Sequence, residues 1–219
     1  MTQHLFILTG ASRGMGLAMA RKLLKPGNTL LCISRKANDT LAAQAKMANV
    51  PLQQWTQDLA RSADVSARLE QWLREQAHGG FASAVLINNA GMIPSIGPLS
   101  DADADDLRQG LRVGLEAPMQ LTAAFLRATA SWPARRKVLN ISSGLGRKAM
   151  ASQSIYCAAK AGMDHFTRCV ALEEALKPNG AAICSLAPGV IDTDMQVQLR
   201  GADASAFPCL LYTSDAADE

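Results

Sequence analysis

Strand-like and helix-like segments alternate along this chain. Short, mostly apolar segments that predict strands lie at residues 5–8, 29–34, 52–57, 84–87, 138–141 and 181–186. Helical composition between them predicts helices over 17–25, 39–48, 64–76, 101–130 and 154–175. Continuous apolar runs are typical of strands buried on both faces of a sheet, and the alternation predicts βαβ units. We therefore predict an α/β fold, a doubly wound parallel sheet of the Rossmann type.

Polar residues refine two of these helices. Ser100 and Asp103 have a spacing like that of a capping box and predict the start of the helix over 101–130. Glu173 and Lys177 lie four positions apart and are placed to pair near the end of the helix over 154–175. The predicted helix over 101–130 is anomalous because it contains Gly110 and Gly114, each of which costs about 1 kcal/mol relative to alanine.

The composition bounds the class of protein. A chain of 219 residues, 48% hydrophobic and 19% charged, has the size and balance of one soluble globular domain. A net charge of +3, evenly spread, argues against nucleic acid or a membrane surface as partner and favours a small molecule. No transmembrane stretch or targeting signal is visible. Five cysteines without a Cys-x-x-Cys pair, and three scattered histidines, suggest a cytoplasmic protein with neither disulfides nor a metal.

A glycine-rich segment, Gly10-x-x-x-Gly14-x-Gly16, follows the first predicted strand and precedes a predicted helix. Glycines let the backbone turn tightly and approach a pyrophosphate, and a helix N-terminus offers free N–H groups and a positive dipole end. The spacing differs from the Gly-x-Gly-x-x-Gly of longer dehydrogenases. By itself the segment predicts either a phosphate-binding turn or merely a tight connection.

Basic residues follow the second predicted strand, where dinucleotide-binding folds contact the adenosine ribose. Arg35 and Lys36 stand there, and residues 34–36 contain no acid to pair with the 2′-OH of NAD. Arg13 in the glycine segment adds another cation. Because arginine suits the 2′-phosphate of NADP, NADP is favoured over NAD. The alternative is that Arg35 is a solvated loop cation.

Ser143, Tyr156 and Lys160 are the candidates for chemistry. Tyr156 and Lys160 lie four positions apart, which places them on one face of a helix. A phenol, with an ordinary pKa of about 10, is a slow acid at neutral pH unless a nearby cation stabilises its phenolate. Ser143, at the end of a predicted strand, can offer its hydroxyl to the same substrate oxygen. The three predict a carbonyl-reducing or alcohol-oxidising site, although a Tyr/Lys pair alone is usually an ordinary surface pair.

The ordered set of motifs resembles the short-chain dehydrogenase/reductase family over residues 5 to about 200. The set consists of Thr9-Gly10-x-x-x-Gly14-x-Gly16, Asp58, Asn88-Asn89-Ala90-Gly91, Ser143, Tyr156-x-x-x-Lys160 and Pro188-Gly189-x-x-x-Thr193. Segments at 156–160, 171–174 and 187–196 are further similar to the sepiapterin reductase and benzil reductase branch. Members of that branch reduce vicinal dicarbonyls or related activated ketones with NADPH.

The resemblance implies a role for each matching residue. Tyr156 would donate the proton, Lys160 would lower its pKa and hold the nicotinamide ribose, and Ser143 would position the substrate oxygen. Hydride would pass from NADPH to the carbonyl carbon. The implied cofactor contacts are Gly10, Ser12, Arg13, Gly14, Met15 and Gly16 around the pyrophosphate, Arg13 and Arg35 at the 2′-phosphate, Asp58 and Leu59 at the adenine, Asn89, Ala90 and Gly91 beside the ribose, and Pro188, Gly189 and Thr193 at the carboxamide.

The function expected from this resemblance is NADPH-dependent reduction of a dicarbonyl or activated ketone to an alcohol. Two alternatives stay open: a 3-oxoacyl-thioester or sugar reductase of the same family, and a non-catalytic NADPH-binding protein. The family commonly dimerises through its two long helices. A homodimer or homotetramer through residues 101–130 and 154–175 is therefore expected.

Gly114 departs from the family pattern. The family usually has an asparagine here, in a Val-Asn-Leu context, which holds a water of the proton relay, whereas this chain reads Val113-Gly114-Leu115. Glycine has no side chain to orient that water, though the vacated space could admit another. We predict slowed but not absent proton transfer, with a gain in turnover in Gly114→Asn.

The C-terminal end is the second departure. The family ordinarily continues through a substrate-covering helix and a further strand, but this chain stops soon after Pro208. Residues 209–219 can be back-translated to a sequencing-library transposase adapter read in frame. We therefore expect a single domain over 1–208 that lacks its last strand and helix, followed by an artefact tail, a hypothesis that the source DNA would test. Sepiapterin reductases use an acid near the C-terminus to bind the pterin, but Asp215 and Asp218 lie in this tail and accordingly receive no such role.

Overall fold

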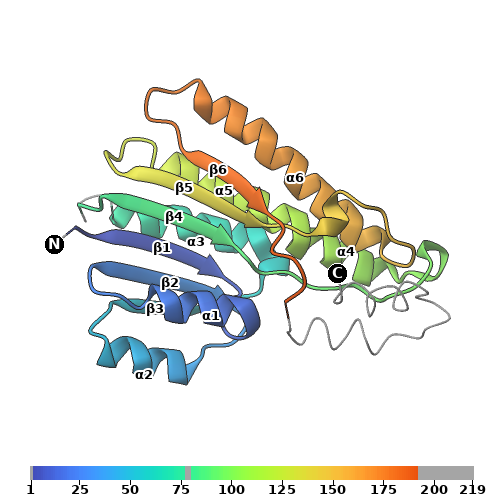
Figure 1. Cartoon of the computed structure of the whole chain (residues 1–219), viewed down its shortest axis with the longest axis horizontal. Helices are drawn as coiled ribbons and strands as arrows, with labels where there is room; N and C mark the ends of the chain where they lie inside the picture. Colours follow the sequence, from blue (N-terminus) through green and yellow to red (C-terminus); the bar gives the residue numbers. More distant parts are fainter. Residues whose placement is uncertain (1, 77–79, 192–219) are drawn as a thin grey trace, which may run out of the picture.

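Six parallel strands form one sheet in the order β3-β2-β1-β4-β5-β6 (Figure 1). The computed structural model describes residues 2–76 and 80–191. The strands are β1 (His4–Thr9), β2 (Asn28–Ser34), β3 (Leu52–Thr56), β4 (Ser83–Asn88), β5 (Arg135–Ile141) and β6 (Ala182–Leu186). The order reverses between β1 and β4, as in a classic dinucleotide-binding sheet. The predicted doubly wound fold is confirmed, whereas Thr193, the boundary at 208 and the tail at 209–219 lie outside the described residues.

Helices cover both faces of this sheet (Figure 1). The α-helices are α1 (Gly14–Leu23), α2 (Asp39–Met47), α3 (Ser62–Glu75), α4 (Ala104–Leu111), α5 (Ala117–Ala128) and α6 (Ser154–Ala175). Short 3₁₀ turns are η1 (Leu59–Arg61), η2 (Leu99–Asp101) and η4 (Gly144–Gly146), and η3 (Arg112–Glu116) is a π-helical turn. No helix among the described residues has the length and hydropathy needed to span a membrane.

Two apolar cores, one on each face, hold the helices to the sheet. The larger core joins inward side chains of β1 and β2, such as Ile7 and Ile33, to α3 and α5, where Leu69 and Phe125 are fully buried. The smaller core lies on the other face, where Leu8 packs with residues of α1 and α2. Alternate residues of β1 thus enter opposite cores, which explains why residues 5–8 of this strand are all apolar.

The predicted long helix over 101–130 is wrong in two respects. Ser100 does not cap it, because it lies in η2, and the N-cap is Asp103, whose carboxylate accepts the N–H groups of Asp105 and Asp106. The helix is also interrupted by the π turn η3 between α4 and α5. A sequence pattern shows the helical period but not one extra residue in a turn, since both arrangements keep apolar residues on the core side.

The two glycines of this region allow close packing against α6. A Cβ on Gly110 would lie 2.8 Å from Cγ2 of Ile155, and a Cβ on Gly114 would lie 3.0 Å from the Cβ of Ala159. A glycine on α6 allows the same close packing from the other side, because a Cβ on Gly162 would lie 2.9 Å from a methyl group of Leu115. The helix-propensity penalty of these glycines is therefore offset by close contact with the helix that carries Tyr156 and Lys160.

A network of buried polar side chains connects β4 and β5 with α5 and α6. Asn88 at the end of β4 donates to Oδ1 of Asn140 on β5 at 2.8 Å, and Asn140 donates to Thr167 of α6 at 2.8 Å. Asn88 also donates to Thr122 of α5 at 3.2 Å. All four side chains are buried, so these bonds fix the register of β4, β5, α5 and α6 relative to one another.

The end of α6 is anchored by a buried acid, and the predicted pair between Glu173 and Lys177 is wrong. Lys177 pairs with Glu174 instead. Glu174 is 1% exposed, accepts the N–H of Ala181 at 2.9 Å and lies 3.7 Å from Arg136 of β5. Lys177 pairs with Glu174 because that buried carboxylate has three partners, whereas an exposed pair with Glu173 would contribute little in water.

Candidate active site

All predicted site residues within the described ranges follow the carboxyl ends of strands or begin the next helix. Because every strand is parallel, these ends lie along one edge of the sheet. Gly10, Ser12 and Arg13 follow β1, Arg35 follows β2, Asp58 and Leu59 follow β3, Asn89 to Gly91 follow β4, Ser143 follows β5, and Pro188 and Gly189 follow β6. Gly14, Met15 and Gly16 form the first turn of α1, and Tyr156 and Lys160 lie near the start of α6. One edge thus assembles residues spread over most of the chain.

The glycine turn requires glycine for two different reasons. Gly10 has φ +71° and Gly14 has φ +54°, a backbone conformation that other residues rarely adopt. Gly16 is needed for space, since a Cβ there would lie 2.1 Å from the carbonyl oxygen of Gly10. The turn therefore folds back onto the start of α1 without any side chain between them.

The N-terminus of α1 fits a phosphate group. Its N-cap, Arg13, makes no side-chain capping bond, and the first helical bond is donated by Leu17 to the carbonyl of Arg13. The preceding N–H groups, those of Gly14, Met15 and Gly16, have no i−4 carbonyl within the helix. Donors of this kind at a positive dipole end would hold the pyrophosphate of a dinucleotide.

Asn89 and Thr9 hold the glycine turn from below. The Oγ1 atom of Thr9 accepts the N–H groups of Asn89 and Ala90, each at 2.9 Å. The side chain of Asn89 donates to the carbonyl oxygens of Thr9 at 2.9 Å and of Gly10 at 3.3 Å. The Asn89 amide therefore supports the turn, and Thr9 joins the site as a supporting residue.

Asn38 is another supporting residue that the sequence did not reveal. Its amide donates to the carbonyl of Ser12 at 3.0 Å, while its Oδ1 accepts the N–H of Leu41 and caps α2. Gln54 on β3 exchanges two hydrogen bonds with the backbone of Asn38. The only signal in the sequence was an asparagine directly before a helix, which indicates a cap but not a contact with the distant turn.

The side chain of Ser143 lies near enough to the Tyr156 phenol to act on the pKa of that phenol. The Oγ of Ser143 also accepts the N–H of Leu145 at 3.2 Å and caps η4. Burial raises the pKa of Tyr156 above its ordinary value, and the side chain of Ser143 partly offsets this. The phenol is thus protonated at neutral pH and adjacent to a hydroxyl, as a proton donor to a carbonyl oxygen must be.

Lys160 is buried, and Asp164 is the charged group that acts on it. Its side chain is 5% exposed, and Nζ donates to the carbonyl of Ile141 at 2.7 Å. Burial lowers the pKa of Lys160 to about 8, while the carboxylate of Asp164 acts in the opposite direction. Nζ lies 5.7 Å from the centre of the Tyr156 ring. The geometry places a cation beside the phenol, although neither group bonds the other directly.

The catalytic candidates lie next to the glycine turn. A Cβ on Gly91 would lie 3.9 Å from Nζ of Lys160, and a Cβ on Gly10 would lie 2.9 Å from the Cα of Ala90. The segment after β4 therefore runs between the two and separates them by little more than its own backbone. A dinucleotide with its pyrophosphate on the turn would extend toward Tyr156 and Lys160.

The remaining predicted contacts differ in their exposure to solvent. Arg13, Arg35 and Asp58 have exposed side chains, and Asp58 accepts the N–H of Ala60 at 2.9 Å as the cap of η1. Leu59 is buried. Gly189, with φ +81°, turns the chain after β6.

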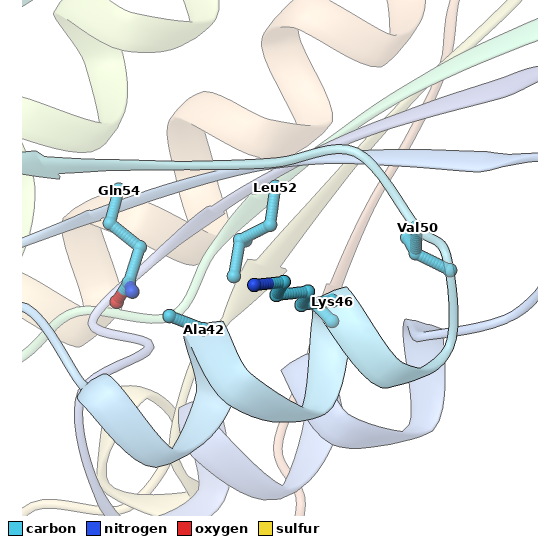
Figure 2. Close-up of a pocket in the computed structure, with 6 residues that line it drawn as sticks. Ala42, Lys46, Val50, Leu52 and Gln54 are labelled. Atoms are coloured by element: carbon cyan, nitrogen blue, oxygen red, sulfur yellow. The ribbon is translucent and has the colours of Figure 1, made fainter.

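A cavity of about 240 Å³ lies elsewhere, between α2 and β3 (Figure 2). It is lined by Ala42, Ala45, Lys46, Val50, Leu52 and Gln54. None of these is a predicted site residue. The chemistry therefore gathers at the strand ends and not in this cavity.

A family comparison agrees with this geometry. The model of the family described as short chain dehydrogenase matches residues 4–204. The chain belongs to the short-chain dehydrogenase family. Within it, a benzil reductase ((S)-benzoin forming) of Bacillus cereus is 36% identical over 194 residues, covering 89% of this chain and 78% of that protein. A sepiapterin reductase of Xenopus tropicalis is 34% identical over 206 residues, covering 90% and 77%.

A solved structure extends the likeness to the fold. The crystal structure of a short-chain dehydrogenase/reductase from Burkholderia vietnamiensis superposes with a TM-score of 0.76 at 37% sequence identity. The match covers 92% of this chain and 93% of that one. The predicted resemblance to the family and to its benzil and sepiapterin reductases is confirmed.

Proposed function

We propose that this protein reduces a dicarbonyl or activated ketone to an alcohol with NADPH, and that Tyr156 donates the proton. The observation that carries the proposal is the nearness of the Ser143 hydroxyl to the Tyr156 phenol, beside the buried ammonium of Lys160 and next to the glycine turn. An acid, a hydroxyl and a cation that converge beside a dinucleotide turn suit carbonyl reduction.

Each residue has a distinct task in this proposal. NADPH would supply the hydride to the carbonyl carbon. The hydroxyl of Ser143 donates to the substrate oxygen and orients it toward the phenol. Tyr156 then gives its proton to the oxygen as negative charge develops there. Lys160 stabilises the phenolate that remains and keeps N–H donors free for the ribose, because the carbonyl of Ile141 takes only one of its three.

NADP is the proposed cofactor because the rim beside the ribose is cationic. Arg35 and Lys36 are exposed directly after β2, and Arg13 is exposed in the glycine turn. Arg35→Asp should lower kcat/KM for NADPH by more than about tenfold and favour NADH, since a carboxylate pairs with a 2′-OH and repels a phosphate. An unchanged preference would mean that Arg35 is a solvated loop cation.

A dicarbonyl or related ketone is the proposed substrate because of the two named relatives. A 3-oxoacyl-thioester is the alternative within the family, since a 3-oxoacyl-[acyl-carrier-protein] reductase of Pseudomonas aeruginosa is 32% identical over 205 residues. A non-catalytic NADPH-binding protein is the third candidate, and Gly114 in the π turn beside Ala159 favours it.

The test is NADPH oxidation by the purified chain with benzil, 1-phenyl-1,2-propanedione, sepiapterin and a 3-oxoacyl thioester. Tyr156→Phe is the control, because it removes the proton donor and keeps the ring. Turnover that disappears in the mutant supports the mechanism and ranks the substrates. Tight NADPH binding without turnover in a folded chain would favour the binding-only alternative.

We also propose a cytoplasmic homodimer or homotetramer. Leu172 on α6 is 72% exposed, its C-cap Leu176 is 87% exposed, and Met119 on α5 is 45% exposed. Apolar side chains that are this exposed on two long helices suit a contact between copies. Sedimentation equilibrium of Leu172→Lys against the parent chain tests it. Free cysteines at 157, 169 and 184 suit a reducing compartment.

A further inference from the structure

Asp164 of α6 is a buried carboxylate that the proposed mechanism does not use. It is 2% exposed, and neither of its oxygens has a hydrogen-bond donor among the described residues. An ionised carboxylate in such a position is costly unless nearby charge compensates it. Buried polar groups without partners are rare and require an explanation.

Two cations flank this carboxylate. The Nε atom of Arg147, just after η4, lies 3.5 Å from Oδ2 of Asp164, and the arginine is 59% exposed. On the inner side is Lys160, one helical turn earlier on the same face of α6. Between the helix and solvent lies η4, where a Cβ on Gly146 would be 2.9 Å from Oδ2 of Asp164 and 3.0 Å from the carbonyl of Lys160.

We propose that Asp164 is a positioning residue for carbonyl reduction: its carboxylate is the counter-charge of the buried Lys160 ammonium, and η4 with Arg147 seals it from solvent. The inference rests on the proposed function, because Lys160 acts there beside Tyr156. The unpaired oxygens are then explained, since the cations of Lys160 and Arg147 compensate the carboxylate charge through space. The glycine at 146 is explained too, because a side chain there would push η4 off the carboxylate.

Few other charged groups face Lys160. On α6, Tyr156, Cys157 and Asp164 lie about one turn from Lys160, and Arg147 after η4 lies against Asp164. From β5 comes the carbonyl of Ile141, and after β4 a Cβ on Gly91 would lie 3.9 Å from Nζ. Asp164 is the charge that opposes the effect of burial on the pKa of Lys160. Loss of its charge should therefore lower that pKa further below about 8.

The test compares Asp164→Asn with Glu173→Gln, a control that removes one exposed negative charge from the same helix. Competitive acetylation followed by peptide mass spectrometry measures the pKa of Lys160 in each folded protein. The expected result is a fall of about one unit in Asp164→Asn and no change in the control. In turnover assays the rate above pH 8 should then fall about tenfold, and the rate near pH 6.5 should stay within about twofold.

A second variant keeps the test decisive where Asp164→Asn fails to fold. Arg147→Met leaves the carboxylate in place and removes a repelling cation, so the pKa of Lys160 should rise or stay, and never fall. An unmoved labelling curve in folded Asp164→Asn, a fall in Arg147→Met, or an equal rate loss at every pH would each overturn the proposal. Labelling needs no turnover, so a shift in a chain that reduces none of the carbonyls would refute only the proposed function.

Discussion

Lys160 donates a 2.7 Å hydrogen bond from Nζ to the carbonyl oxygen of Ile141, the last residue of β5. Ser143 follows two positions later, and Tyr156 precedes Lys160 by one turn of α6. One bond therefore ties the helix that presents the phenol to the strand that presents the hydroxyl. It also fixes the ammonium in a buried place, where its charge is sensitive to pH.

The first prediction concerns the pH dependence of reduction. Tyr156 must be protonated and Lys160 charged. Burial raises the pKa of Tyr156 above 10 and lowers that of Lys160 to about 8. The lysine therefore titrates first, and kcat should fall as the pH rises through about 8. The measurement is kcat at saturating NADPH from about pH 6 to about pH 10. A kcat that falls only near or above pH 10 would assign the titration to Tyr156 instead.

The second prediction concerns stability, because a buried lysine destabilises the fold while it is charged. Burial lowers the pKa of Lys160 from its ordinary value of 10.5 to about 8, so the unfolded chain binds more protons between these two values. Stability should therefore rise with pH across that interval. In urea unfolding the parent chain should gain up to about 3 kcal/mol across the interval, and Lys160→Met should lack this rise. The same rise in the variant would assign it to another group.

The third prediction concerns Gly114, where any new side chain would crowd Ala159 and oppose the gain in turnover expected from asparagine. A Cβ at this position would lie 3.0 Å from the Cβ of Ala159. Asparagine adds both a crowding methylene and an amide, whereas alanine adds only the crowding. We therefore expect kcat of Gly114→Asn to exceed that of Gly114→Ala by about tenfold or more, because the amide can orient a water.

Gly114→Ala is the matched control for this comparison. It should lower kcat if the close approach of η3 to α6 sets the position of Tyr156. Equal values of kcat for the two variants would show that no side-chain amide is wanted at 114. The parent chain's turnover would then not be limited by the missing asparagine.

The fourth prediction concerns the buried acid at the end of α6. Glu174→Gln leaves Arg136, which is 5% exposed, without its charged partner. Loss of one member of a buried ion pair typically costs 3–5 kcal/mol, and we expect about that in denaturant unfolding. Asp64→Asn is the control, since its pair with Arg61 is 63% and 79% exposed and should change stability by less than about 1 kcal/mol. Similar losses in both variants would contradict the anchoring role of Glu174.

The sequence predicts those features that depend on local order. Strand–helix alternation, the glycine turn and the spacing of Tyr156 and Lys160 are contained in short stretches, and the six strands and α6 were confirmed where they were predicted. What the sequence did not predict depends on partners that are remote along the chain. Glu174 was chosen over Glu173 by Arg136, which lies 38 positions earlier. Asn38 and Asp164 look like a cap and a surface acid until η4, β3 and the glycine turn are placed beside them.

The last prediction concerns Asn89, which the family resemblance placed beside the ribose and which the structure shows bonded to the glycine turn. Its amide donates to the carbonyls of Thr9 and Gly10. Asn89→Ala should therefore loosen the turn and raise the Kd for NADPH by about tenfold or more, with kcat at saturating NADPH reduced much less, because Ser143, Tyr156 and Lys160 are held from β5 and α6.

Thr9 provides the companion variant for this test. Thr9→Val keeps the shape of the side chain and removes the oxygen that accepts the N–H groups of Asn89 and Ala90. If both residues act on the turn, the double variant should weaken NADPH binding by less than the product of the single effects. Fully multiplicative effects on Kd would mean that the two residues act independently. A loss confined to kcat would instead place Asn89 in direct contact with the reacting groups.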